Sequence, residues 1–288
     1  MSWMKLAGLL TALGLLSVTS LSATCWAADG PNQVPFKLYR GYAIVVLGSI
    51  GGLKNLNLLI DTGAVPSVLD ARMARRLHLR GQSERVDVPG SVLATERVTV
   101  PEVEIGPSHV NELSVIVNDL SYAEEALEIR IDALIGFDVL GQSSFTIDYE
   151  SRRLVFGPVD SSFVAVSYSP GLPYAIVLLH IQGETLAILV DTGASNLVLF
   201  QSGIQDCPSA IHTLGRETWT SMVGEMPVAK AHLTDTYLGA MPWGERVAYI
   251  PENTANQRVG IAGLLGTVTL GKRVAFDPVR RVVAWEAK

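Results

Sequence analysis

The strongest constraint on the fold is that the sequence repeats itself. The tripeptide Asp-Thr-Gly occupies residues 61–63 and again residues 191–193, which is 130 positions later (191 − 61). Each copy follows an apolar run, and each is followed by an alanine and further apolar residues. Self-similarity at a fixed offset indicates that one supersecondary unit is built twice. We therefore expect the two segments to be equivalent in the fold, and to bring Asp61 and Asp191 to one shared site.

Three further blocks recur in the same order along the chain. The matching pairs are residues 41–47 with 173–179, residues 133–136 with 263–266, and residues 145–156 with 274–285, the last with one gap. These matches predict two homologous lobes, residues 33–158 and residues 164–288. The connection between them would lie near residues 157–162, because the Gly, Pro, Asp and Ser found there interrupt regular structure.

Short runs rich in β-branched and aromatic residues, separated by Gly and Pro, predict a mainly β architecture. In the first lobe we expect strands at residues 42–47, 56–60, 98–105, 113–117, 145–147 and 153–156. In the second lobe we expect them at residues 174–181, 185–190, 228–233, 246–250, 273–276 and 281–285.

Two helices are expected in the first lobe. Residues 67–79 carry Leu69, Met73 and Leu77 at a spacing of four, which is typical of one helix face, and Gly81 would end the helix. A second, short helix is expected at residues 122–127.

The repeated blocks resemble the aspartic proteases of the retroviral and pepsin types. Those families carry Asp-Thr-Gly or Asp-Ser-Gly after an apolar strand, and later an apolar-apolar-Gly segment. The resemblance covers most of the chain after residue 40 and implies two retropepsin-like closed-barrel lobes related by pseudo-two-fold symmetry. The active site would lie between the lobes. Because each repeat is about the size of one retroviral-type subunit, the resemblance also implies a monomer that corresponds to that homodimer.

By this resemblance Asp61 and Asp191 would be the catalytic carboxyls of an endopeptidase that acts on peptides or proteins. Two carboxyls held about 3 Å apart cannot both ionise easily, so they share one proton. One carboxylate would then deprotonate a water molecule while the other carboxyl donates to the substrate carbonyl. This chemistry requires neither a metal nor a cofactor, and we expect none.

The resemblance also assigns supporting roles. The threonines would bond across the lobe interface, and the glycines of the tripeptides would let the two turns approach each other closely. The glycines that end the apolar blocks would lie in strands packed against the active-site loops. The supporting residues are Thr62, Gly63, Ala64, Gly136, Thr192, Gly193, Ala194 and Gly266.

Alanine follows each tripeptide, at Ala64 and Ala194, where pepsin-type sites usually place a hydroxyl residue. A hydrogen-bond donor to an ionised carboxylate lowers its pKa. The alanines therefore predict a less acidic pair of carboxyls and a pH optimum that is mildly acidic to neutral. Residues 88–91 and 222–225 are the candidate tips of hairpins that would close over a substrate.

Residues 1–27 have the pattern of a secretory signal, with Lys5 before an apolar stretch at residues 6–18 and small residues near Ala27. This predicts export to the periplasm or the medium. An uncleaved membrane anchor and a lipoprotein signal at Cys25 remain as alternatives. Removal of residues 1–27 would leave Cys207 as the only cysteine, which excludes an internal disulfide and favours a bacterial envelope.

The remaining features exclude other function classes. A formal net charge of −6 and a pI near 5.4 argue against a nucleic-acid surface. The five histidines are scattered without metal-ligand spacing, so no metal partner is expected. Asp148 and Asp277 recur in the repeat, and their position before a turn favours capping over catalysis. A peptide-binding or scaffold protein that has the same fold but no activity remains the alternative function.

Overall fold

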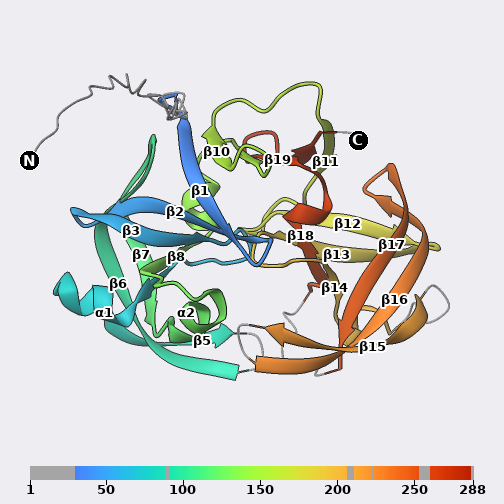
Figure 1. The fold of residues 1–288 in the computed structure, drawn as a ribbon, viewed down its shortest axis with the longest axis horizontal. Coiled ribbons are helices and arrows are strands. Elements are labelled where there is room, and N and C mark those ends of the chain that lie inside the picture. The colour runs from blue at the N-terminus through green and yellow to red at the C-terminus, as the bar shows by residue number, and fades with distance from the viewer. Residues whose placement is uncertain (1–29, 89–90, 206–210, 222–223, 253–259, 287–288) are drawn as a thin grey trace, which may run out of the picture.

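The computed structural model describes residues 30–88, 91–205, 211–221, 224–252 and 260–286 (Figure 1). These residues form a mainly β protein, as the sequence predicts. The first half of the chain, up to residue 158, lies beside the second half in Figure 1, and strands of both halves meet at the top of that view. The predicted signal at residues 1–27 lies outside the described residues.

The first half contains ten strands and three helices among its described residues. The strands are β1 (Gln33–Tyr39), β2 (Ala43–Ile50), β3 (Leu53–Ile60), β4 (Val68–Asp70), β5 (Gln82–Val88), β6 (Ser91–Ile105), β7 (Ser108–Asn118), β8 (Ala133–Ile135), β9 (Phe145–Asp148) and β10 (Arg153–Phe156). The helices are α1 (Ala71–Arg76), α2 (Ser121–Leu127) and α3 (Phe137–Leu140).

The second half continues the β architecture with short 3-10 helices. Its strands are β11 (Val164–Ser167), β12 (Ile176–Ile181), β13 (Glu184–Asp191), β14 (Leu197–Leu199), β15 (Ile211–Ser221), β16 (Gly224–Leu238), β17 (Met241–Pro251), β18 (Gly263–Gly266), β19 (Arg273–Asp277) and β20 (Val282–Trp285). The 3-10 helices include η1 (Gln201–Gly203) and η4 (Thr267–Thr269).

The same strand pairings occur in both halves around the Asp-Thr-Gly segments. Strand β3 runs parallel to β8, and β8 runs antiparallel to β4. In the second half β13 runs parallel to β18, and β18 runs antiparallel to β14. The last residues of β3 and β13 are buried, which explains their continuous apolar runs, because a parallel strand is covered on both faces.

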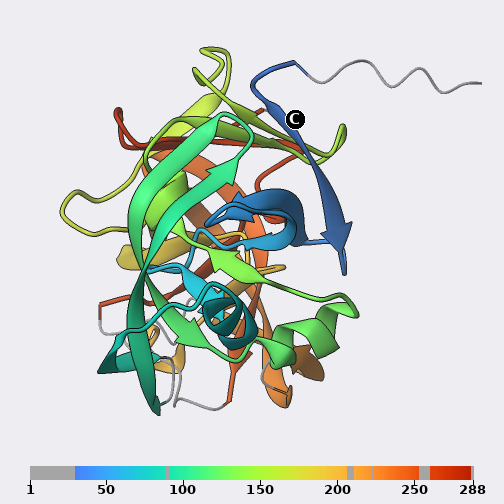
Figure 2. The ribbon, with the colours of Figure 1, turned by 90° about the vertical axis from the view of Figure 1, so that its left-hand side faces the viewer.

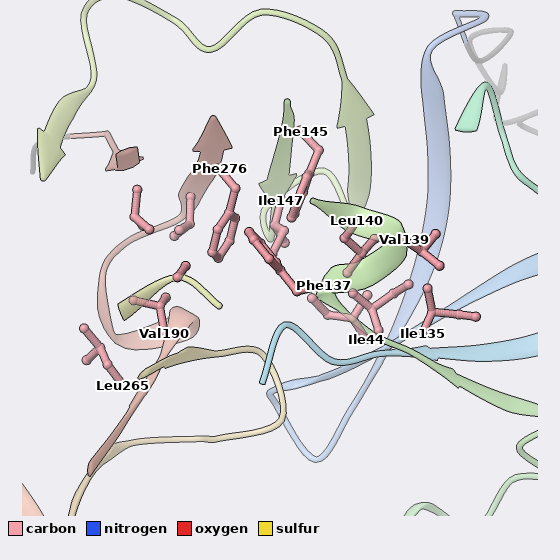
Figure 3. Packing of buried hydrophobic residues seen from close by; sticks show 14 of the residues in the cluster. Ile44, Ile135, Phe137, Val139, Leu140, Phe145, Ile147, Val190, Leu265 and Phe276 are labelled. Carbon is pink, nitrogen blue, oxygen red and sulfur yellow. The ribbon is translucent and has the colours of Figure 1, made fainter. Parts of the chain in front are cut away.

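A separate set of pairings joins the two halves. Strand β9 of the first half pairs antiparallel with β19 of the second half, with Phe145 opposite Phe276. These strands lie in a row β11-β20-β19-β9-β10-β1, which continues into β2 and makes a 13-stranded sheet. Figure 3 shows the core beside this junction, where the Phe145 and Phe276 rings stack with centroids 4.9 Å apart. The halves therefore share backbone hydrogen bonds as well as a core.

The turns that follow β9 and β19 are each capped by an aspartate, as the sequence predicts. Asp148 accepts hydrogen bonds from the amides of Glu150 and Ser151, at 3.0 and 2.9 Å, and Asp277 accepts one from the amide of Arg280 at 3.0 Å. Both aspartates thus cap turns, which confirms the prediction for them. Turn capping therefore explains why Asp148 and Asp277 occur in both copies of the repeat, without a role in catalysis.

The predicted helix at residues 67–79 is wrong at both ends. Residues 68–70 instead form β4, because their backbone pairs with β7 and β8. Helix α1 begins only after Asp70, whose side chain caps it by accepting from the amide of Arg72 at 2.8 Å. It ends at Arg76 with Leu77 as its C-cap, because His78 adopts a left-handed φ of 53°, three positions before Gly81. The second predicted helix is confirmed as α2, which lies next to α1 in Figure 2.

The described helices are too short, or too polar, for any of them to span a bilayer. The lobe boundaries at residues 33–158 and 164–288 stay a prediction. Strand β11, at the start of the second range, pairs with β20 at its end.

Candidate active site

Asp61 and Asp191 lie on equivalent turns at the ends of β3 and β13. The amide of Gly63 donates to Oδ1 of Asp61 at 2.9 Å, and the amide of Gly193 donates to Oδ1 of Asp191 at 2.6 Å. A carboxyl that accepts from the backbone two residues further on closes a tight local turn. Each carboxyl is therefore oriented by its own tripeptide before any contact with the other half.

The turns that carry Asp61 and Asp191 are in contact, and Gly63 and Gly193 determine how closely they approach each other. A methyl group built on Cα of Gly193 would lie 3.0 Å from Oδ1 of Asp191 and 3.4 Å from Oδ1 of Asp61. The two carboxyl oxygens can therefore be no farther apart than the sum of those two distances. A methyl group on Gly63 would lie 2.6 Å from Cγ of Asp191, which is closer than real contacts allow. Both carboxyls share one space, and a larger residue at Gly63 would displace one of them.

The two threonines bond across the interface between the halves. The amide of Thr62 donates to Oγ1 of Thr192 at 3.0 Å, and the amide of Thr192 donates to Oγ1 of Thr62 at 3.0 Å. Each hydroxyl also donates to the main chain of the other half: Thr62 to the carbonyl of Val190 at 2.9 Å, and Thr192 to that of Ile60 at 2.8 Å. Both threonines are buried, so these four bonds replace lost water contacts and hold the turns in register.

The glycines of the apolar blocks lie against the loops that follow the aspartates. A methyl group on Gly136 would be 2.3 Å from the carbonyl oxygen of Ala64, and one on Gly266 would be 2.4 Å from that of Ala194. The amide of Gly266 also donates to the carbonyl of Asn196 at 3.0 Å. Strands β8 and β18 thus pack against the two loops with no room for a side chain at either glycine.

Residues 46–139 match the family model described as aspartyl protease. This segment is therefore similar to the retropepsin-like aspartyl proteases. A comparison with curated proteins gave no match. The matched segment includes Asp61 and Gly136, and it ends before Asp191. The proteins that this model describes are proteases, which are hydrolases.

Two tyrosines near the carboxyls of Asp61 and Asp191 were not identified as part of the site from the sequence. Burial raises the pKa of Tyr42, the charge of Arg40 opposes that rise, and the charge of Asp191 adds to it. Burial also raises the pKa of Tyr122, with a contribution from the charge of Asp61. Each carboxyl thus has a partly buried phenol close enough to feel its charge, and both phenols keep their protons at neutral pH.

Tyr174 is the repeat counterpart of Tyr42 and makes another contact between the halves. Its hydroxyl donates to the carbonyl of Val65, in the loop that follows Asp61, at 3.2 Å. The sequence carried a signal for these residues, because Tyr-Ala-Ile occurs at both 42–44 and 174–176. What it lacked was any indication that the ring faces the opposite half.

Long hairpins lie where the closing flaps were expected. Val88 pairs with Ser91 in the β5–β6 hairpin, and Ser221 pairs with Gly224 in the β15–β16 hairpin. In Figure 1, β5 and β15 both point toward the middle of the molecule at its lower edge. The tip residues themselves, 89–90 and 222–223, lie outside the described residues.

A group of possible metal ligands lies away from the carboxyl pair, on the β6–β7 hairpin. Glu102, Glu104 and His109 bring one ligand atom each within 4.8 Å of one another. Sequence spacing did not show this group, because His109 reaches Glu104 only through the strand pairing. Oε2 of Glu104 already accepts from the Ser49 hydroxyl, and Nε2 of His109 already bonds to Oδ1 of Asn111.

Proposed function

We propose that this protein is an aspartic endopeptidase in which Asp61 and Asp191 together activate one water molecule. The observation that carries the proposal is the position of Gly193, against which both carboxyls lie. The match of residues 46–139 to the aspartyl protease family supports it independently.

Two adjacent carboxyls that share one proton supply both an acid and a base. The ionised carboxylate takes a proton from the water, whose oxygen attacks the carbonyl carbon of the peptide bond. The protonated carboxyl donates to the carbonyl oxygen. Collapse of the tetrahedral intermediate breaks the C–N bond, and the leaving nitrogen takes a proton from the pair.

We further propose that the halves are lobes related by a pseudo-two-fold axis that passes between Thr62 and Thr192. The equivalent pairings of β3 with β8 and of β13 with β18 support this symmetry, as do the reciprocal threonine bonds. A peptide or protein would then bind across the axis, between the carboxyl pair and the β5–β6 and β15–β16 hairpins. Because both carboxyls come from one chain, the proposed active form is a monomer.

Export is part of the proposal and rests on the sequence of residues 1–27. Cleavage after Ala27 would release the enzyme into the periplasm or the medium. Edman sequencing of the mature protein tests this, because a chain that begins at Ala28 supports export by cleavage. A chain that still begins at Met1, or a lipid-modified Cys25, would support one of the anchored alternatives.

The proposal is tested by replacing each carboxyl separately. We expect Asp61→Asn and Asp191→Asn each to lower kcat for peptide cleavage by about 100-fold or more, because an amide cannot exchange the proton. The far-ultraviolet circular dichroism spectrum should not change. Asp160→Asn is the control, since Asp160 is exposed and caps a surface turn, and it should cleave like the wild type.

The substrate for this test is a diverse peptide library, assayed from acid to neutral pH. Pepstatin-like inhibitors, which resemble the hydrated transition state, should bind the wild type and bind both Asn variants more weakly. Binding of library peptides without cleavage by the wild-type protein would instead support the inactive peptide-binding function.

A further inference from the structure

A further contact between the two halves lies next to β18, the strand that pairs with the end of β13. Tyr149, in the turn after β9, shares a hydrogen bond with Thr267, with 2.6 Å between Oη and Oγ1. Thr267 is fully buried and is the first residue after β18. The contact thus joins a turn of the first half to the segment that supports Asp191 in the second half.

Thr267 follows Gly266, and Gly266 contacts the Asp191 loop at both of its ends. It is the residue opposite Asp191 in the parallel pairing of β13 with β18. It also donates to Asn196 and lies against the carbonyl of Ala194, where even a methyl group does not fit. Because this packing leaves no spare space, a displacement of Thr267 must displace the Asp191 loop.

The equivalent position of the first half makes a different contact. Phe137 follows Gly136 as Thr267 follows Gly266, and it has no hydroxyl. Its ring packs edge-on against Phe276 and Tyr168, with centroids 5.9 and 6.4 Å away, as Figure 3 shows for Phe276. The hydrogen bond at this position therefore acts on the Asp191 side of the pair and has no counterpart at Phe137.

The surroundings of Tyr149 hold its hydroxyl in place and keep it protonated. Its ring packs edge-on against Phe36 at 6.1 Å, and its amide donates to the carbonyl of Lys272 at 2.8 Å. Burial raises the pKa of Tyr149, the hydrogen bond with Thr267 lowers it, and the charge of Asp191 raises it further. The phenol remains neutral wherever a carboxyl pair titrates, so its contribution does not depend on its own ionisation.

We propose that Tyr149 is a positioning residue for Asp191, which it holds through Thr267 and the backbone of Gly266. This inference rests on the proposed function, because it takes Asp61 and Asp191 to be the reacting pair. Tyr149 acts on the geometry of the pair and takes no part in proton transfer to substrate.

The role predicts a particular change in the pH profile. Two carboxyls in close contact titrate as a pair with widely separated apparent pKa values. If the Asp191 loop loosens, the carboxyls move apart, their interaction weakens and the two apparent pKa values converge. The bell-shaped profile of kcat/KM would become narrower, which a loss of overall stability would not cause.

The test uses Tyr149→Phe, which keeps the ring, and Thr267→Val, which keeps the size of the side chain. We expect each to lower kcat about tenfold with KM changed less than about twofold, because misplacement of a reacting group mainly slows the chemical step. Thr267→Ser, which keeps the hydroxyl, should retain activity near the wild-type level. The double variant Tyr149→Phe/Thr267→Val should be no slower than either single variant, because both remove one interaction.

Lys272→Ala is the matched control. It removes the exposed ion pair of Lys272 with Glu150, which joins the same two segments at 2.7 Å. It leaves the Tyr149–Thr267 bond in place, so we expect wild-type kinetics and an unchanged profile.

A second measurement keeps the inference separate from the proposed function. Carboxyl carbon resonances of ¹³C-aspartate-labelled protein report the titration of the pair without any substrate. Converging apparent pKa values in Tyr149→Phe would support the positioning role even if the wild type cleaved no peptide, an outcome that would overturn the proposed function alone. Unchanged titration in both Tyr149→Phe and Thr267→Val, with only a lower Tm, would overturn the positioning role.

Discussion

At the residue scale, the carboxyl pair depends on positions where a side chain is missing. Gly63 and Gly193 leave the space in which the carboxyls of Asp61 and Asp191 meet. The buried hydroxyls of Thr62 and Thr192 hold the two turns together through hydrogen bonds between the halves. Small residues therefore set the distance between the two carboxyls, and replacing any of them would move a carboxyl.

Gly63→Ala tests this dependence. Its methyl group would lie 2.6 Å from Cγ of Asp191, so the carboxyl or the turn must shift. We expect kcat for peptide cleavage to fall by about 100-fold, because small displacements of reacting groups are costly. Gly30→Ala is the control, since a methyl group there meets only Nε2 of Gln33, at an ordinary contact distance of 3.9 Å. Wild-type cleavage by Gly63→Ala would contradict the close approach of the two turns.

Ala64→Thr tests the origin of the pH optimum. If the added hydroxyl donates to the ionised form of Asp61, it lowers the apparent pKa of the pair. The base would then be available at lower pH, so the acidic limb of the kcat/KM profile should move toward acid. Ala64→Val has the same shape without a donor, and should leave that limb in place. Identical profiles for the two variants would show that the missing hydroxyl does not set the optimum.

At the scale of elements, helix α1 illustrates how a short element is kept in place. Six residues are too few for a helix to be stable alone. Asp70 caps α1, and Arg72 bonds both to Asp70 and to Glu124 on α2. Glu124 also accepts from the amide of Ile131 at 3.0 Å, so one carboxylate connects α1, α2 and the segment before β8.

Glu124→Gln tests that connection through its pH dependence. The hydrogen bond from Arg72 lowers the pKa of Glu124, burial opposes this, and the amide of Ile131 contributes to it. A lowered pKa means that the stabilisation is present above the unfolded-state value, about 4.3, and is lost as the pH falls through the folded value. We expect the variant to lose about 1–2 kcal/mol in urea unfolding at pH 7, and less as the pH falls.

The neighbouring Glu125 is exposed, so Glu125→Gln is the control and should unfold like the wild type. A stability loss in Glu124→Gln that stays the same from pH 7 to acid would contradict an ionic contribution.

At the scale of the whole molecule, the halves are joined by a shared sheet as well as by the carboxyl turns. The β9–β19 pairing places Phe145 and Phe276 at its centre, and both are fully buried. Phe137 adds a third ring against Phe276. Because the aspartates come from different halves, this junction and the threonine bonds decide whether the carboxyls face each other.

Phe276→Ala tests whether the junction makes the halves unfold together. Removal of a fully buried ring should cost about 3–5 kcal/mol, because it leaves a cavity between β9 and β19. We expect differential scanning calorimetry to show a lower Tm and a split of the unfolding peak into two. Val279→Ala is the control, since Val279 is 88% exposed in a turn of the same half. A single peak at the wild-type Tm would contradict the role of the junction.

Much of the fold was accessible from the sequence because strand periodicity and turn residues are local signals. The strands at residues 153–156 and 273–276 match their predicted ranges closely, and α2 differs by one residue. Strand β4 was mistaken for the start of a helix, because a spacing of four also occurs by chance in a short run. What makes residues 68–70 a strand is their pairing with β7 and β8, which the local sequence does not contain.

The order of residue types alone shows that four blocks recur along the chain and that each Asp-Thr-Gly copy places a carboxyl two residues before a glycine. Those properties follow from residue types at fixed offsets, so they can be read without coordinates. The three-dimensional packing was needed to show that the two turns touch, that Thr62 and Thr192 bond reciprocally, and that Tyr149 bonds to Thr267. These contacts join residues far apart in the chain, and they exist because the packing of the two halves brings those residues together.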